Sequence, residues 1–342
     1  MTQKTQSLDI QAVDAYLTEY LNGYQGPLSA SKFQLGQSNP TFKLTTPNRN
    51  YVLRRKPLGQ LLKSAHAVDR EFRVQSALQG SEVPVAKMHL LCQDDLIIGS
   101  DFYVMDLIDG RNFNEPTLDE LSNADRGEVM DEINRVLAAL HNVDVNAADL
   151  GDYGAPGNYF ERQIGRWIKQ YRAAETEPLA SMDMLIEWLL NHIPEDDGQR
   201  TLVHGDFRLD NLMFERSGTK CLAVLDWELS TTGHPYSDLA SIIMQWQLPV
   251  GKVTRGLAGV DRVAKGLPSD DDFIAQYCAR RGIANIDNFG FYVAFCFFRM
   301  SAIVQGVYKR ALDGNASDPE GGLKAGEHVS TYANLGLKAT GG

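Results

Sequence analysis

Three oxygen-bearing side chains near the middle of the chain have the types and the spacing that phosphoryl-transfer chemistry requires. Asp206 follows the apolar run Thr201–Val203, Asn211 comes five residues later, and Asp226 ends a second apolar run. A carboxylate can accept a hydroxyl proton and orient the oxygen, while an amide oxygen and a second carboxylate can hold magnesium ions against phosphates. The two runs are typical of short strands joined by a hairpin, so we expect these side chains at neighbouring strand ends.

A purely structural interpretation competes with the catalytic one. In that alternative His204 is a packed core histidine and the two aspartates cap turns. Polar groups are costly to bury without a partner, so their concentration here needs a reason. We favour the catalytic interpretation because three residue types, two spacings and a strand context agree.

At these residues the chain resembles the aminoglycoside phosphotransferase family of kinase-like small-molecule kinases. The segment H-G-D-x-x-x-x-N takes the place of the kinase catalytic loop, and Asp226-Trp227-Glu228 takes the place of D-F-G. The sequence is more similar still to the phosphotransferase domain associated with acyl-CoA dehydrogenases, through G-Q-S-N-P-T-F, V-L-R-R-K-P and H-G-D-F-R-L-D-N-L. The resemblance extends from about Phe33 to about Arg310.

The resemblance implies an α+β, protein kinase-like bilobal fold. We expect a small antiparallel sheet plus a helix in an N-terminal nucleotide-binding lobe over residues 1–107, and a mainly helical catalytic and substrate-binding lobe over 108–342. ATP and Mg²⁺ are expected in the cleft, with Asp206 as the catalytic base and Asn211 and Asp226 as metal ligands. The implied reaction is transfer of the γ-phosphoryl group to a hydroxyl of a small molecule. A hydroxyacyl-CoA-like acceptor and an aminoglycoside-like or amino-alcohol-like acceptor both stay open, as does ATP against GTP.

A loop between the first two expected strands is the candidate for covering the nucleotide phosphates. It contributes Gly36, Ser38 and Asn39 to the expected cofactor site, through backbone N–H groups and small polar side chains. The loop has one glycine, and Pro40 supplies no N–H. An ordinary hairpin turn is therefore the alternative interpretation.

The third expected strand, Tyr51–Arg55, supplies the cation for the phosphates. Alignment of V-L-R with the usual strand places Arg54 where the family of kinases carries lysine, and strand alternation puts Arg55 on the opposite face. Glu71, on an expected helix over Ala65–Gln79, is the expected partner of Arg54. The alternatives are that Arg55 is a solvated strand charge and that Glu71 is a rim charge.

The expected hinge that binds the adenine edge follows the sheet. Asp106 and Leu107 lie where the apolar strand Ile97–Leu107 passes into a polar loop, so we include them in the cofactor site. Asp94-Asp95 is predicted as the turn that precedes this strand. Beyond the hinge, Thr117–Glu120 is predicted as a helix-capping box.

The rest of the chain is expected to be mainly helical. The resemblance implies that Asp238 braces the catalytic loop, and Ser269 is predicted to cap a helix. Residues 249–268 show no clear periodicity and are either a substrate lid or an exposed loop with ordinary surface charges. The last thirty or so residues are expected to hold one short helix. The remaining expected helices span Ile10–Leu21, Tyr159–Tyr171, Met182–Leu190 and Asn288–Lys309.

Composition bounds the partners and the compartment. The 342 residues are 43% hydrophobic and 23% charged with a net charge of −11, which argues against nucleic acid or an anionic membrane as partner. The four cysteines form no C-x-x-C pair and lie in apolar surroundings, as reduced core thiols do. No apolar signal-like segment opens the sequence. We expect a cytoplasmic enzyme with a small-molecule substrate and leave its oligomeric state open.

Two other functions fit part of the pattern. A catalytically silent nucleotide-binding pseudokinase or scaffold would explain the arginine at the lysine position and the single-glycine loop. A protein Ser/Thr kinase is less favoured because no A-P-E element or regulatory segment follows Asp226.

Overall fold

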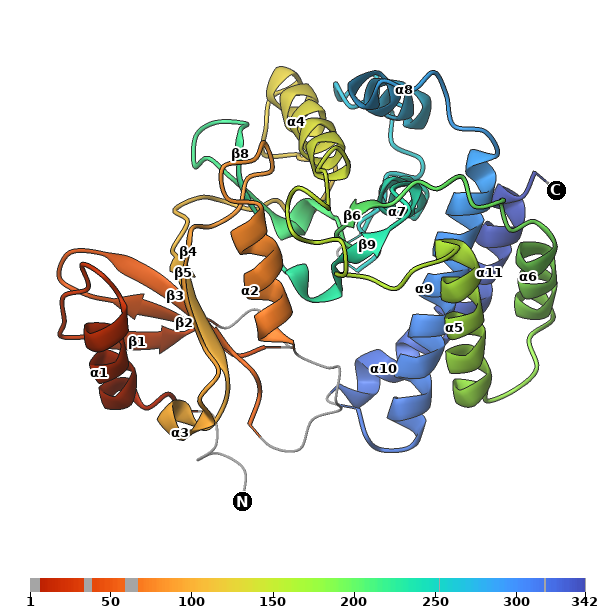
Figure 1. Ribbon diagram of the computed structural model, residues 1–342. Helices are drawn as coiled ribbons and strands as arrows, with labels where there is room; N and C mark the ends of the chain where they lie inside the picture. The colour runs from red at the N-terminus through yellow and green to blue at the C-terminus, as the bar shows by residue number, and fades with distance from the viewer. Residues whose placement is uncertain (1–6, 34–38, 59–66, 252, 317, 342) are drawn as a thin grey trace. The chain divides into compact units, whose positions relative to one another are not determined.

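The computed structural model describes residues 7–33, 39–58, 67–251, 253–316 and 318–341 (Figure 1). Contacts divide the chain into two compact units. The sheet unit comprises Met1–Phe113, Asn146–Leu150 and Leu209–Ser230, and the helical unit comprises Asn114–Val145, Gly151–Arg208 and Thr231–Gly342.

An antiparallel five-stranded sheet organises the sheet unit. Its strand order is β1-β2-β3-β5-β4, so β3 lies at the centre between β2 and β5. The strands are β1 Ser29–Lys32, β2 Thr41–Thr45, β3 Asn50–Arg55, β4 Met88–Cys92 and β5 Phe102–Asp106. The helices are α1 Ile10–Tyr20, α2 Val68–Ala77 and the short α3 Asp95–Ile98.

Helices cover both faces of this sheet (Figure 1). On one face Val13 and Leu17 of α1 are fully buried in a core cluster that includes Leu53 of β3 and Phe102 of β5. Successive strand residues point to opposite faces, so Arg54, next to Leu53, points to the other face, which α2 covers. The central strand thus carries core residues toward α1 and a cation toward α2.

A hairpin from the middle of the chain completes the sheet unit. It consists of β7 Leu212–Phe214 and β8 Cys221–Val224, flanked by the 3₁₀ turns η1 Leu209–Asn211 and η2 Trp227–Leu229. Arg111 and Phe214 exchange two backbone hydrogen bonds of 2.8 and 2.7 Å. A Cβ at Gly110 would lie 2.4 Å from the Phe214 carbonyl oxygen, so only glycine allows this approach. The sequence-based prediction places this hairpin in the second lobe, which begins at residue 108. The contacts place it in the sheet unit instead.

The helical unit is built around the long helix α9, which packs against α5, α7, α10 and α11. By length and composition α9 could cross a membrane, but 61% of its apolar window is buried within the protein, which favours a core helix. A two-stranded ribbon of β6 Thr201–Val203 and β9 Thr231–Gly233 lies in the same unit. The helices are α4 Asn123–His141, α5 Tyr159–Ala174, α6 Ala180–Asn191, α7 Tyr236–Trp246, α8 Asp270–Arg281, α9 Phe289–Leu312, α10 Pro319–Gly326 and α11 His328–Ala339.

Three local predictions are wrong. Asp94 does not form a hairpin turn; its carboxylate accepts the Leu96 N–H at 3.0 Å and caps α3, which delays the next strand to Phe102. Thr117 does not cap a helix, because Leu118 has a left-handed φ of 48° and α4 is capped instead by Ser122. The C-terminal segment holds two helices, α10 and α11, rather than one.

The predicted cap at Ser269 is confirmed and supports a stability prediction. Its hydroxyl accepts the Asp272 N–H at 3.0 Å, and the Asp272 carboxylate reaches back to the Ser269 N–H. Replacing Ser269 with alanine removes the acceptor, so we expect the free energy of unfolding to fall by about 1 kcal/mol. Urea unfolding monitored by circular dichroism measures this, with the exposed mid-helix Gln276→Ala as control. Equal losses in both variants would contradict the assigned cap.

Candidate active site

The loop that carries Asp206 is held by a buried carboxylate of the helical unit. His204, Gly205 and Asp206 follow directly after β6. Asp238, in the first turn of α7, accepts the backbone N–H of His204 at 2.6 Å and that of Gly205 at 2.9 Å. Gly205 has a φ of 82°, a conformation that glycine adopts without strain. These contacts support the bracing role that the resemblance implied for Asp238.

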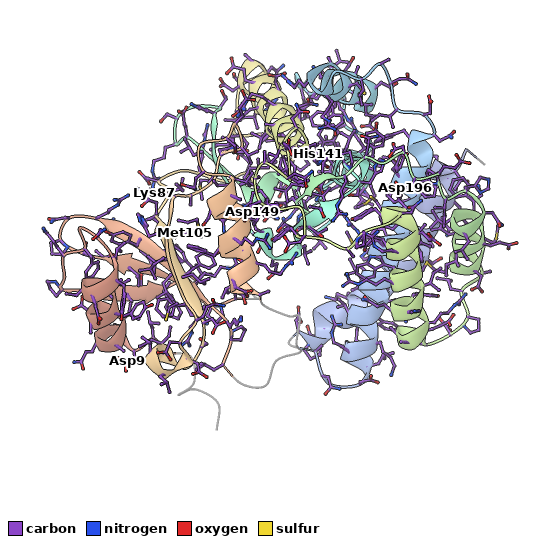
Figure 2. The ribbon with its side chains drawn as sticks, in the orientation of Figure 1. Asp9, Lys87, Met105, His141, Asp149 and Asp196 are labelled. Atoms are coloured by element: carbon purple, nitrogen blue, oxygen red, sulfur yellow. The ribbon has the colours of Figure 1, made fainter. Side chains whose placement is uncertain are left out.

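A second buried contact fixes Asp238 itself. The Nε2 of His141, near the end of α4 (Figure 2), lies 3.5 Å from the Asp238 carboxylate, and its Nδ1 lies 2.7 Å from the Tyr277 hydroxyl. Burial lowers the pKa of His141 more than Asp238 raises it. Burial alone would raise the pKa of Asp238, but His141 and the His204 N–H outweigh it and the pKa is lowered. Both ring nitrogens of His141 thus have partners within the helical unit, which makes it a structural histidine.

Asp206 is paired with a neighbouring guanidinium rather than isolated. The Nε of Arg208 lies 3.1 Å from a carboxylate oxygen of Asp206, and about a third of each side chain is exposed. Arg208 therefore lies beside the expected catalytic base. Its place two residues after Asp206 is the sequence signal that could have predicted this contact.

Asn211 and Asp226 meet in the sheet unit, at the end of the β7–β8 hairpin. The Leu225 N–H donates to the Asn211 carbonyl at 2.7 Å, which makes Asp226 the next residue beyond this pairing. Asp226 has left-handed torsion angles, φ 64° and ψ 61°, and 38% of its side chain is exposed. Such a conformation costs energy for a non-glycine residue and is often found at functional sites. Buried Trp227 anchors the turn through a 2.9 Å hydrogen bond from its Nε1 to the Val224 carbonyl.

This pair suits magnesium chemically. An amide oxygen and a carboxylate are hard ligands, and Mg²⁺ commonly uses one or two protein oxygens together with phosphate oxygens and water. The local geometry brings together two of the three predicted catalytic residues. Asp206 belongs to the helical unit, while Asn211 and Asp226 belong to the sheet unit.

Arg54 connects the central strand to three carboxylates. Its Nε lies 3.1 Å from Glu71 of α2, and its Nη2 lies 2.8 Å from Asp226 and 3.6 Å from Glu228. The predicted Arg54–Glu71 ion pair is thus confirmed, and Glu71 is not a rim charge. Burial lowers the pKa of Arg54, but Glu71, Tyr103 and Asp226 together raise it above its usual value.

Arg55 points to the opposite face, as strand alternation predicted. Its guanidinium lies over the Phe42 ring, 5.6 Å from the ring centre, and only 1% of the residue is exposed. The alternative of a solvated strand charge is therefore wrong. Burial lowers the pKa of Arg55. Arg54 faces α2 while Arg55 points away from it, and the assignment of Arg54 to the position of the phosphate-binding lysine stays a prediction.

Glu71 is one of the most enclosed acids of the sheet unit, at 1% exposure. Its carboxylate accepts a 2.8 Å hydrogen bond from the Asn39 side-chain nitrogen and a 3.0 Å hydrogen bond from the Tyr103 hydroxyl. Burial raises the pKa of Glu71, whereas Arg54 and Tyr103 act to lower it. This hydrogen bond links Asn39 to α2, and the predicted contact of Asn39 with the nucleotide stays a prediction.

The other predicted cofactor residues are tested less directly. Gly36 and Ser38 lie outside the described residues. The Asp106 carboxylate accepts from Arg49 at 2.5 Å and lies 2.7 Å from His89 Nε2, and its backbone N–H donates to the Lys87 carbonyl. The hinge assignment of Asp106 and Leu107 stays a prediction.

The structure adds ion pairs in the 249–268 segment and one further acid, Glu228, to the predicted picture. Arg262 pairs with Asp270 at 2.5 Å and Lys265 with Asp119 at 2.5 Å, so these cations serve local contacts within the helical unit. Glu228 joins the Arg54 network and was not among the predicted site residues. The sequence feature that could have predicted its role is an acid at the position that glycine occupies in D-F-G.

Neutralising Glu71 should weaken the sheet unit. Glu71→Gln keeps the side-chain shape but leaves Arg54 without its nearest buried anion, so we expect the free energy of unfolding to fall by about 2 kcal/mol. Urea denaturation gives the value, and the exposed Glu215→Gln in the same unit is the matched control. A stability equal to that of the control variant would show that the buried pair contributes nothing.

The buried His141 should make the protein sensitive to mild acid. Its folded pKa lies below the ordinary 6.5, so the folded state binds fewer protons than the unfolded state. The resulting stability is present above about pH 6.5 and is lost as pH falls toward the folded pKa. We expect His141→Gln to flatten the slope of unfolding free energy between about pH 7.5 and about pH 5.5 by up to about 1.4 kcal/mol per unit. The exposed His192→Gln should keep the wild-type slope.

Comparison with known proteins agrees with this geometry. The sequence profile of the phosphotransferase enzyme family matches residues 29–281. The chain is 44% identical over 317 residues to mouse acyl-CoA dehydrogenase family member 10, covering 92% of this chain and 30% of the relative. It is 41% identical over 337 residues to human acyl-CoA dehydrogenase family member 11, covering 96% and 43%. The chain thus spans less than half the length of these curated relatives.

Solved structures share the fold. A proposed aminoglycoside phosphotransferase of Ralstonia eutropha JMP134 has a TM-score of 0.91 at 46% identity, covering 98% of both chains. Spectinomycin phosphotransferase, solved with ADP and spectinomycin, has a TM-score of 0.64 at 12% identity, covering 98% and 99%, and shows the fold alone. The chain belongs to the phosphotransferase enzyme family and has the protein kinase-like fold of these structures.

Proposed function

We propose that this protein transfers the γ-phosphoryl group of ATP, bound with Mg²⁺, to a hydroxyl group of a small molecule. The observation that carries the proposal is the joint placement of Asn211 and Asp226 at one hairpin end, beside the Arg54–Glu71 pair. Those groups supply magnesium ligands and a phosphate cation. Neighbouring structures support the nucleotide, since spectinomycin phosphotransferase was solved with ADP.

Each residue has a distinct task in the proposed reaction. Asp206 orients the acceptor hydroxyl and takes its proton while the oxygen forms a bond to the γ-phosphorus. The bond from that phosphorus to the bridging oxygen breaks, and ADP leaves. Arg54 holds the phosphates with its forked donors, and Glu71 keeps Arg54 in place. Mg²⁺, held by Asn211 and Asp226, would neutralise the phosphate charge.

Alignment and charge neutralisation account for most of the expected rate. An alcohol is a weak acid, and phosphoryl transfer needs little proton removal early in the reaction. Asp238 contributes by fixing the backbone that carries Asp206, at hydrogen-bond distances of 2.6 and 2.9 Å. A preset loop avoids the cost of ordering the base in each turnover.

For the acceptor we propose a hydroxyacyl thioester or a related hydroxy acid. The curated relatives are named as acyl-CoA dehydrogenase family members, and the chain matches a part of each. An aminoglycoside or amino alcohol is the second candidate, favoured by the neighbours that were solved in complex with spectinomycin and hygromycin B. We also propose a cytoplasmic location, for which the four free, buried cysteines are the support.

A silent nucleotide-binding scaffold is the alternative from another class. This alternative was suggested by the arginine at the lysine position. Arg54, however, makes the ion pair with Glu71 that such a lysine would make. A silent protein would bind ATP and release no ADP with any acceptor. A protein Ser/Thr kinase would place labelled phosphate on serine or threonine of a protein instead.

Two substitutions separate the proposed roles. Asp206→Asn should lower turnover about a hundredfold or more while ATP affinity changes little, because only the base is lost. Asp226→Ala should weaken Mg²⁺-dependent nucleotide binding itself, since a metal ligand is removed. Calorimetric titration of ATP with and without Mg²⁺, together with ADP release, measures both effects. Asp196→Asn, on the loop before β6 (Figure 2), is the matched control.

The acceptor is identified by an ADP-release screen. The panel contains hydroxyacyl-CoAs, aminoglycosides, choline-like alcohols and sugars, with Asp206→Asn as the blank. Full activity of Asp206→Asn would overturn the assigned mechanism, and ATP binding without ADP release on any acceptor would favour the silent scaffold.

A further inference from the structure

Arg299 is a charged residue in the middle of the apolar core helix α9. Thirteen residues separate it from the end of that helix at Leu312, so its charge does not serve the helix terminus. The residues before it, Phe295 to Phe298, are all fully buried. A cation at such a position is costly to keep unless an anion or a ligand compensates it.

The described surroundings of Arg299 supply no such anion in direct contact. Its Nη2 donates to the Ser241 hydroxyl at 3.4 Å, and its guanidinium lies 6.0 Å from the Phe295 ring centre. Among the residues that the structure describes, no carboxylate oxygen lies within ion-pair distance of this guanidinium. The residue is partly exposed, and of the five N–H donors of its guanidinium only the Nη2 contact with Ser241 is described.

The position of Arg299 relates it to the catalytic loop through α7. One turn before it, the Cys296 sulfur contacts the Ser237 carbonyl at 3.6 Å, next to the brace Asp238. One turn further along α7, Ser241 contacts Arg299 itself. Arg299 thus packs on the same helix that fixes the backbone of Asp206, and all of these residues belong to the helical unit.

Electrostatics agree with this placement. Burial lowers the pKa of Arg299, but Cys296, Tyr159, Asp238 and Asp206 together raise it, so the side chain stays charged. Asp206 is thus one of the groups that favour the charged form of Arg299. Arg208 lies 3.1 Å from the same carboxylate. The expected base has two guanidinium groups in its neighbourhood within the helical unit.

We propose that Arg299 is a specificity-determining residue that binds an anionic group of the acceptor, a carboxylate or a phosphate, while Asp206 binds its hydroxyl. This inference rests on the proposed phosphotransfer and names the class of its substrate. Two guanidinium groups near the base attract an anionic acceptor and repel a polycationic aminoglycoside. Ser241 orients the guanidinium, and its weak hydrogen bond can be exchanged for a charged one.

The test compares acceptors that share one carbon skeleton and differ in charge. The anionic probes are 3-hydroxybutanoate and 3-hydroxybutanoyl-CoA, the neutral probe is butane-1,3-diol, and the cationic probe is 4-aminobutan-2-ol. ADP release gives kcat and KM for the wild type, Arg299→Gln, Arg299→Lys and Arg310→Gln. Arg310 is the matched control, because it is an exposed arginine on the same helix.

We expect the anionic probes to be the better acceptors in the wild type. Arg299→Gln should raise their KM about tenfold or more, leave the KM for ATP and for the diol unchanged, and be partly rescued by Arg299→Lys. Arg310→Gln should match the wild type. An unchanged ATP KM also shows that Arg299→Gln is folded. The inference is overturned if Arg299→Gln leaves the KM of the anionic probes unchanged, or if the diol or the amine is the better acceptor.

A binding measurement separates failure of this inference from failure of the proposed function. Calorimetry measures 3-hydroxybutanoyl-CoA binding to Asp206→Asn and to the Asp206→Asn, Arg299→Gln double variant. Loss of binding in the double variant, with no ADP release from the wild type, would overturn the phosphotransfer and leave the anion site standing. ADP release with the diol or the amine at rates equal to those of the anionic probes would overturn the anion site and leave the phosphotransfer standing.

Discussion

The contact on which the sheet unit most depends is the ion pair between Arg54 and Glu71. Glu71 is almost fully enclosed, and its two oxygens are met by an arginine, an amide and a phenol from three segments far apart in sequence. A carboxylate in such surroundings is stable only when all its acceptor sites are filled. The pair thereby fixes α2, β3 and Asn39, just before β2, relative to one another. It also sets the position of Arg54, whose outer nitrogen reaches the predicted metal ligand Asp226.

Arginine changes how this position works compared with lysine. A lysine ammonium is a point charge that can serve one partner at a time, whereas the planar guanidinium presents nitrogens in fixed directions. Here the Nε faces Glu71 while Nη2 faces Asp226 and Glu228. One side chain therefore joins the structural acid to the acids of the hairpin. Incoming phosphates would exchange with carboxylates at Nη2 while the Nε contact with Glu71 stays, so the geometry of the cation is kept.

Several parts of this arrangement follow from sequence because they depend on short-range rules. Strand alternation predicts that Arg54 and Arg55 diverge, and helical spacing predicts that Glu71 points toward the sheet. The hairpin differs from the prediction, because β8 pairs with β7, whereas the Thr201–Val203 run pairs with β9. Other features depend on distant contacts that no local pattern contains. Asp94 caps a helix instead of a turn, Glu228 reaches Arg54, and the hairpin packs on Arg111 rather than with the helices.

In the helical unit the backbone segment that carries Asp206 is held in place without burial of an uncompensated charge. Asp238 is ionised and enclosed, and it is balanced by two backbone N–H groups and a neutral His141 rather than by a cation. A guanidinium in direct contact with Asp238 would compete with the N–H groups that position Asp206. Because the brace is balanced by dipoles, the nearby charge of Arg299 is not consumed by it. The separation of a dipole-balanced brace from a charged arginine on the next helix leaves that cation for a ligand, and it makes the charge of the acceptor the property that this unit is built to distinguish.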